Sequence, residues 1–155
     1  MKTFLFSLAL CLTTLNSIAQ DHQSQEWFSD VNLAIQKSNE TGKPMFLFFT
    51  GSDWCGWCIR LQKEVFQTPY FTQWAKENVI LVELDFPRQK QLPDQVRQQN
   101  QRMQQILPVQ GYPTVWFVNA TLNDGKINID KLGSTGYLAG GPKVWVDNAN
   151  GILKK

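Results

Sequence analysis

The chain has 155 residues, of which 43% are hydrophobic and 18% are charged, and its formal net charge is +2 at pH 7. This near-neutral balance argues against nucleic acid or a charged membrane surface as a partner. The length supports one domain with a sizeable core, and we see no internal repeat.

The amino terminus has the pattern of a secretory signal peptide at residues 1–19. Lys2 precedes a short apolar stretch, and small side chains stand at Ala19 and two positions before it, where a signal peptidase cleaves. Cleavage near Ala19 removes Lys2, so 14 of the 15 Lys and Arg residues remain against 13 Asp and Glu. Lipid attachment at Cys11 is not expected, because Leu10 stands where bacterial lipoprotein signals have a small residue.

Secretion to the bacterial periplasm or exterior would place the mature chain where disulfides persist. Residues 20–28 are predicted to form a flexible leader and residues 29–155 a single domain. Within that domain, a first amphipathic helix is predicted to begin near Ser29 or Asp30 and to stop before Gly42.

A cysteine pair follows the next predicted element, a buried strand at residues 44–50. Residues 54–58 read Trp-Cys-Gly-Trp-Cys, and apolar side chains then recur at helical spacing. The unpaired N–H groups at a helix start stabilise an anion, so Cys55 would be held partly as a thiolate and is the expected nucleophile. Cys58 lies one turn further on, close enough to resolve a mixed disulfide formed by Cys55.

The cysteine pair has two other interpretations, a zinc site and a purely structural disulfide. A zinc site needs three or four ligands, but Cys11 would be lost with the signal peptide and the only histidine, His22, lies far away in the sequence. We therefore expect no metal and no other cofactor. A purely structural disulfide would close so short a loop that it would contribute little stability.

The following elements indicate a parallel part of the sheet. Thr68 and Pro69 form a good helix start, and Asn78 ends that helix. Residues 79–85 are nearly all apolar and rich in branched side chains, which is typical of a strand covered on both faces.

Glutamine dominates the next segment, residues 89–105. A surface helix is predicted at residues 94–107, with the glutamines on its solvated face. Its docking side is predicted to consist of Val96, Met103, Ile106 and Leu107.

The carboxy-terminal part is predicted to contain a hairpin and a last helix. Residues 111–114, Gly-Tyr-Pro-Thr, lead into a strand at 115–118, and Asn-Asp-Gly at 123–125 turns the chain into a second strand at 126–129. Pro142 starts the helix, whose buried stripe is predicted to be Val144, Trp145, Ala149, Ile152 and Leu153.

This order of elements and motifs resembles that of thioredoxin-like proteins over residues 27–155. The α/β fold implied is a central mixed sheet flanked by helices, and residues 49–58 look most similar to secreted bacterial members of the DsbD carboxy-terminal type. The resemblance implies that Pro113 is cis and lies against the cysteine pair. It also implies that Tyr112 offers backbone groups to an extended substrate, and we expect Gly111 beside it to be part of the substrate-binding site.

Two positions depart from the family pattern. Phe49 stands where many thioredoxins have a buried aspartate that helps proton transfer. Trp57 stands where other members have proline or histidine, and it brings no positive charge to Cys55. Because Trp54, Trp57 and Tyr112 flank the cysteines, we expect them to contact a substrate, with ordinary packing as the alternative.

The sequence therefore predicts a monomeric thiol-disulfide oxidoreductase that acts on protein thiols and disulfides through Cys55 and Cys58. The DsbD-like surroundings favour a reductant kept reduced by a membrane electron donor. The alternative is a non-catalytic binding module, such as a chaperone or a metal or haem-protein assembly factor. A catalyst needs Cys55 exposed and Cys58 shielded, whereas a binding module needs neither.

Overall fold

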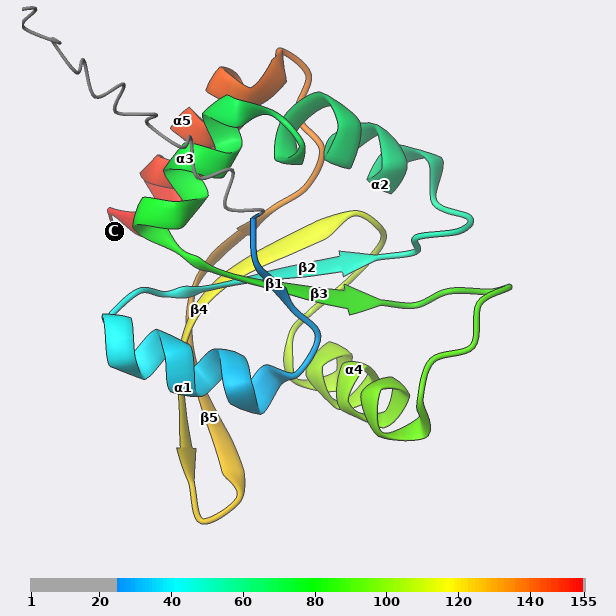
Figure 1. Cartoon of the computed structure of the whole chain (residues 1–155), viewed down its shortest axis with the longest axis vertical. Coiled ribbons are helices and arrows are strands. Elements are labelled where there is room, and N and C mark those ends of the chain that lie inside the picture. Colours follow the sequence, from blue (N-terminus) through cyan, green and yellow to red (C-terminus); the bar gives the residue numbers. More distant parts are fainter. Residues whose placement is uncertain (1–24, 155) are drawn as a thin grey trace, which may run out of the picture.

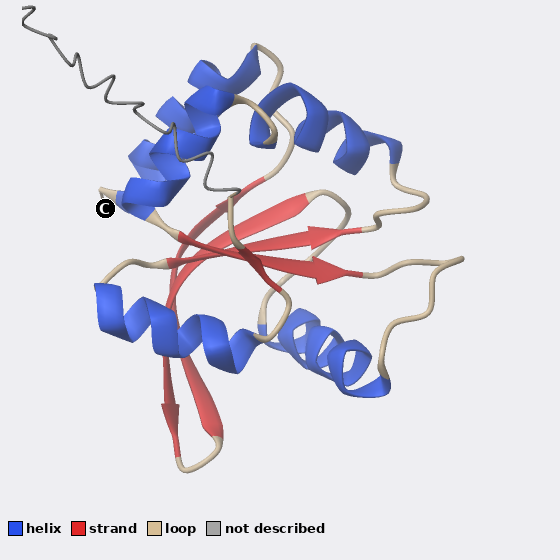
Figure 2. Cartoon of the chain, in the orientation of Figure 1, coloured by secondary structure: helices blue, strands red, loops and turns tan. Residues whose placement is uncertain are grey.

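The computed structural model describes residues 25–154, which form a mixed five-stranded sheet with helices on both faces (Figures 1 and 2). The strand order is β1-β3-β2-β4-β5, in which β1, β3 and β2 are parallel and β4 and β5 are antiparallel to their neighbours. The predicted thioredoxin-like sheet is thus confirmed. The strands are β1 (Trp27–Phe28), β2 (Met45–Thr50), β3 (Ile80–Asp85), β4 (Thr114–Asn123) and β5 (Lys126–Thr135).

The prediction of a flexible leader at residues 20–28 is wrong for its last two residues. Trp27 and Phe28 form β1 and pair with β3. The Trp27 ring packs 5.7 Å from the ring of Phe46 and 5.9 Å from that of Phe66, so aromatic burial holds this segment on the sheet. The predicted signal peptide, its cleavage near Ala19 and the start of the leader lie outside the described residues.

The helices divide between the two faces of the sheet (Figure 1). Side chains of α1 and α4 pack in one core cluster, and those of α2, α3 and α5 pack in the other. The bounds are α1 (Val31–Thr41), α2 (Gly56–Leu61), α3 (Pro69–Asn78), α4 (Asp94–Ile106) and α5 (Gly141–Leu153). Asp30 and Thr68 cap α1 and α3 as expected, each accepting backbone N–H bonds.

The helix that follows the cysteines is interrupted by a π turn, η1 (Gln62–Phe66), which the sequence did not predict. The amide of Gln67 donates to the carbonyl of Gln62, 2.9 Å away, across five residues. The wider turn buries the adjacent side chains Val65 and Phe66 together. Phe66 then packs between Phe48 and Phe71.

Aromatic side chains fill the core beneath α2, α3 and α5. Trp145 is fully buried, and its indole donates to the carbonyl oxygen of Gly136, 2.9 Å away. Rings lie 5.1 to 5.8 Å apart in many of these pairs, a spacing that favours edge-to-face contacts. This packed face holds the helix that carries the cysteines.

Two predicted helix faces need correction. In α5, Val146 is buried whereas Val144 is 46% exposed, because at 100° per residue Val146 lies closer to the direction of Trp145 and Ala149. In α4, Ile106 is 41% exposed and Asn100 is buried in its place.

The predicted turn between β4 and β5 is confirmed, although both strands are longer than expected. Asp124 and Gly125 adopt φ values of 49° and 76°, the left-handed pair that a two-residue hairpin requires. The hairpin tip extends past α1 (Figure 1).

Candidate active site

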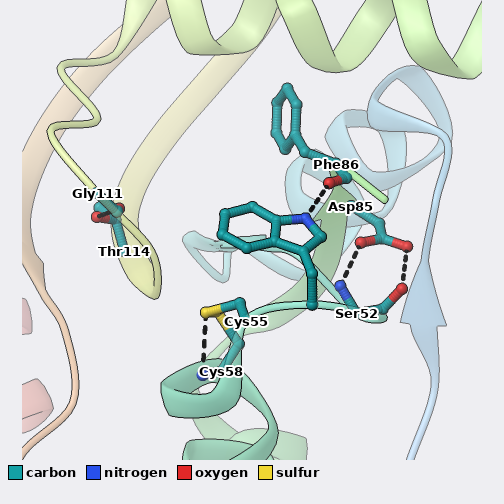
Figure 3. The surroundings of a disulfide bond; sticks show 8 residues. Ser52, Cys55, Cys58, Asp85, Phe86, Gly111 and Thr114 are labelled. Atoms are coloured by element: carbon teal, nitrogen blue, oxygen red, sulfur yellow. Dashed lines mark hydrogen bonds between the residues drawn. A yellow bond between two sulfur atoms is a disulfide. The ribbon is translucent and has the colours of Figure 1, made fainter. Parts of the chain in front are cut away.

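Cys55 and Cys58 form a disulfide at the start of α2, with Cα atoms 5.2 Å apart. Cys55 is the N-cap residue, and the backbone amide of Cys58 donates to Cys55 Sγ over 3.2 Å (Figure 3). Cys55 is 6% exposed and Cys58 is fully buried. In the oxidised protein Cys58 is therefore shielded as predicted, whereas the prediction that Cys55 is exposed is wrong, because Cys55 is buried as well.

The cis-proline loop, residues 111–113, contacts the cysteine loop, residues 51–55, through aromatic rings. The Tyr112–Pro113 peptide bond is cis, the form that the resemblance implies. The Tyr112 ring lies 5.6 Å from the ring of Trp54, and its hydroxyl accepts a bond from the Gln104 amide. Burial raises the pKa of Tyr112, which keeps the hydroxyl neutral. Gly111 is exposed, and its carbonyl accepts a 2.7 Å bond from the Thr114 hydroxyl.

A second loop, residues 86–90 after β3, is bonded to the cysteine loop. Asp85 accepts bonds from the backbone amide of Ser52 at 2.8 Å and from its hydroxyl at 2.6 Å. The Trp54 indole donates to the Phe86 carbonyl over 2.8 Å. Figure 3 shows both connections beside the disulfide. Trp54 is therefore fixed between the two loops.

Asp53, in the cysteine loop, forms a third connection by accepting hydrogen bonds from the loop at residues 86–90. Its carboxylate accepts backbone bonds from Arg88, Gln89 and Lys90 at 2.9, 2.7 and 3.0 Å. These bonds lower the pKa of Asp53, and those from Arg88 and Lys90 have the largest effect, so the carboxylate stays ionised. Sequence reasoning missed Asp53 and Asp85, since each binds a segment more than 30 residues away.

Trp57 forms the other flank of the cysteine pair. The residue is 55% exposed and its ring lies 5.0 Å from the ring of Tyr137, so Trp57 combines surface exposure with packing. Arg60 lies over both rings and pairs with Glu64 at 2.7 Å. The Tyr137 hydroxyl bonds Glu64 and, with Arg60, lowers the pKa of that carboxyl. Tyr137 was not predicted from sequence.

Phe49, which stands where many thioredoxins have a buried aspartate, is buried against Phe86 on the face covered by α1 and α4. Glu83 instead lines a cleft of about 270 Å³ with Phe48 and Gln62, beneath the start of η1. Burial, followed by the charge of Asp85, raises the pKa of Glu83.

Over residues 25–154, no three His, Cys, Asp or Glu side chains gather in a way that could hold a metal ion. Nor does this part of the chain contain a helix long and apolar enough to cross a membrane.

Fold and site together define a class of proteins, those that exchange disulfides on a thioredoxin scaffold. The chain belongs to the thioredoxin-like family, whose model matches residues 26–120.

Comparison with individual proteins agrees with this assignment. The disulfide bond reductase DsbH of Chlamydia pneumoniae is 32% identical over 97% of this chain and 90% of its own length. A solved structure described as a DsbH oxidoreductase has the same identity, 95% coverage of both chains and a TM-score of 0.75. The DsbD carboxy-terminal domain of Neisseria meningitidis shares the fold, with 17% identity, a TM-score of 0.51 and coverage of 81% of this chain and 98% of that domain.

Proposed function

We propose that the protein is a thiol-disulfide oxidoreductase that reduces disulfide bonds in other proteins. The observation that carries the proposal is the Cys55–Cys58 disulfide at the helix start, in which Cys58 is fully buried and Cys55 keeps 6% exposure. Similarity to a disulfide bond reductase along nearly the whole chain supports the same activity.

The reaction begins with both cysteines reduced. The Cys55 thiolate attacks one sulfur of the substrate disulfide, forms a mixed disulfide and releases one substrate thiolate, which takes up a proton from solvent. Cys58 then loses its proton and attacks Cys55 Sγ, which releases the second substrate thiol and leaves the Cys55–Cys58 disulfide. Two electrons and two protons pass to the substrate. The amide of Cys58 is already 3.2 Å from Cys55 Sγ in the oxidised state, so it can stabilise negative charge on that sulfur.

Substrate binding is assigned to the loops beside the cysteines. Gly111 and Tyr112 would offer backbone groups to an extended segment, with Pro113 shaping the loop, and Trp54 and Trp57 would form the two sides. Support comes from the exposure of Gly111 and Trp57 and from the ring contact between Trp54 and Tyr112.

The protein would work as a monomer in the periplasm or outside the cell, after removal of residues 1–19. Its single domain would consist of residues 29–155 together with Trp27 and Phe28 of β1. A dithiol in that oxidising compartment needs a donor to remain reduced, and a membrane dithiol protein of the DsbD type fits that need.

Reduction of insulin by dithiothreitol tests the activity. The wild-type protein should accelerate insulin precipitation, whereas Cys55→Ser should fall to the rate of dithiothreitol alone because the attacking thiolate is missing. Lack of acceleration by the folded wild type would contradict the proposed enzyme activity.

Titration of the Cys55–Cys58 pair against glutathione tests the direction of electron flow. Potentials in this fold range from about −270 mV in thioredoxin to about −120 mV in DsbA. We expect a value toward the thioredoxin end. A value near that of DsbA would identify an oxidant instead.

A further inference from the structure

Arg88 lies on the indole ring of Trp54, the residue immediately before Cys55. Its guanidinium carbon is 3.8 Å from the ring centroid, a close cation–π contact. The ring contact involves no hydrogen bond, so it leaves N–H groups of the guanidinium for a further partner, and their fork matches a carboxylate.

The position of Arg88 is set from both sides of this contact. Its own backbone amide and those of the next two residues donate to Asp53. Trp54 is held in turn by its bond to the Phe86 carbonyl. A cation fixed in this way loses less conformational entropy when it binds a ligand.

Arg88 also differs from its neighbours in charge pairing. On the Trp57 flank of the site, Arg60 pairs with Glu64 at 2.7 Å. In the same loop as Arg88, Lys90 lies 3.7 Å from the Asp85 carboxylate. Arg88 is exposed and forms no ion pair within residues 25–154. The Asp53 carboxylate near it is occupied by three backbone amides. The Arg88 guanidinium, on the Trp54 side of the site, therefore remains available to pair with a negatively charged group.

We propose that Arg88 is a specificity-determining residue that binds an aspartate or glutamate of the substrate protein, a few residues from the disulfide being reduced. The inference rests on the proposed function and adds the chemistry of the preferred substrate. The carboxylate would meet the edge of the Arg88 guanidinium while the substrate sulfur meets Cys55. Asp53 is a positioning residue for this contact, since it holds the backbone of Arg88.

Two synthetic disulfide-linked peptides that differ only in Glu or Gln two residues from the cysteine provide the test. Single-turnover reduction by the reduced full-length protein gives a rate constant for each peptide. At low ionic strength the wild type should favour the Glu peptide by up to about fivefold, the upper range for an exposed ion pair. The preference should fall toward one in 0.5 M salt, because salt screens the pair.

Variants locate the preference. Arg88→Gln should bring the Glu-to-Gln ratio to about one, and Arg88→Lys should keep part of it, since charge remains but the fork is lost. Arg102→Gln removes the same charge from the exposed surface of α4 and should keep the wild-type ratio.

Equal rates for the two peptides with the wild type, or an unchanged ratio in Arg88→Gln, would overturn the inference and leave the proposed function standing. Failure of the wild type to reduce either peptide would contradict the proposed function and this inference together.

Discussion

Glu83 is a carboxyl group enclosed on the side of the sheet that carries the cysteines. It shares a cleft with Phe48 and Gln62, and burial raises its pKa above the ordinary value of 4.5. The native state therefore binds its proton more tightly than the unfolded chain does. Stability must fall as pH rises from the unfolded pKa through the raised folded pKa.

Replacement of Glu83 by Gln removes this titration while keeping the shape of the neutral acid. The free energy of unfolding of Glu83→Gln, relative to wild type, should increase as pH rises through that window and then stay constant. Urea unfolding at a series of pH values measures the difference. A pH-independent difference for Glu83→Gln would show that the fold does not raise the pKa of Glu83.

Among single residues, the sequence predicted those whose role follows from a local motif. Cys55 and Cys58 are recognisable because their spacing at a strand-to-helix junction is itself the signal, and Pro113 follows from the family resemblance. Arg88 and Tyr137 could not be recognised in the same way. Their roles come from contacts with Trp54 and Trp57, and no local pattern encodes those contacts.

The two loops after β2 and β3 act as one structural element. Gly51 starts the cysteine loop, and Trp54 packs so closely over it that a Cβ atom at residue 51 would overlap the indole ring. The bonds of Asp53 and Asp85 then join this loop to residues 86–90. The absence of a side chain at Gly51 therefore lets Trp54 reach the Phe86 carbonyl.

Substitution Gly51→Ala should displace the Trp54 indole and break its bond to Phe86. We expect a loss of about 1–3 kcal/mol in the free energy of unfolding, the usual cost of overpacking. The Trp54 indole N–H resonance should also move in the NMR spectrum. Gly151→Ala is the matched control, because a Cβ there meets no atom within 4 Å and alanine favours a helix. An unmoved indole resonance in Gly51→Ala would refute the packing argument.

Elements with strong local signals were predicted, including α1 and α3 with their caps and the β4–β5 turn. The π turn η1 was not, because apolar residues at 61 and 65 fit an ordinary helix equally well. The inward face of α4 was predicted only in part. Asn100 occupies that face because its side-chain amide bonds the Asp85 carbonyl, 2.9 Å away, and a polar residue gives no such signal in advance.

In the whole molecule, the cysteine pair lies where the two parallel strands β2 and β3 end. β2 and β3 run side by side, so the loops that follow them emerge at the same edge of the sheet. The aromatic core beneath α2 and η1 supports the cysteine helix from below. Class and fold could be predicted from the order of elements, but the attachment of β1 to the edge of β3 could not, since two residues are too few to show a strand period.

Mixed-disulfide capture tests the central claim, that Cys55 attacks and Cys58 resolves. Reduced Cys58→Ser protein mixed with oxidised insulin should accumulate a covalent adduct, and peptide mapping by mass spectrometry should place it on Cys55. The wild type should instead release reduced insulin chains and return to its Cys55–Cys58 disulfide, and Cys55→Ser should form little adduct because Cys58 is fully buried. An adduct mainly on Cys58 of Cys55→Ser, with none on Cys58→Ser, would contradict the account.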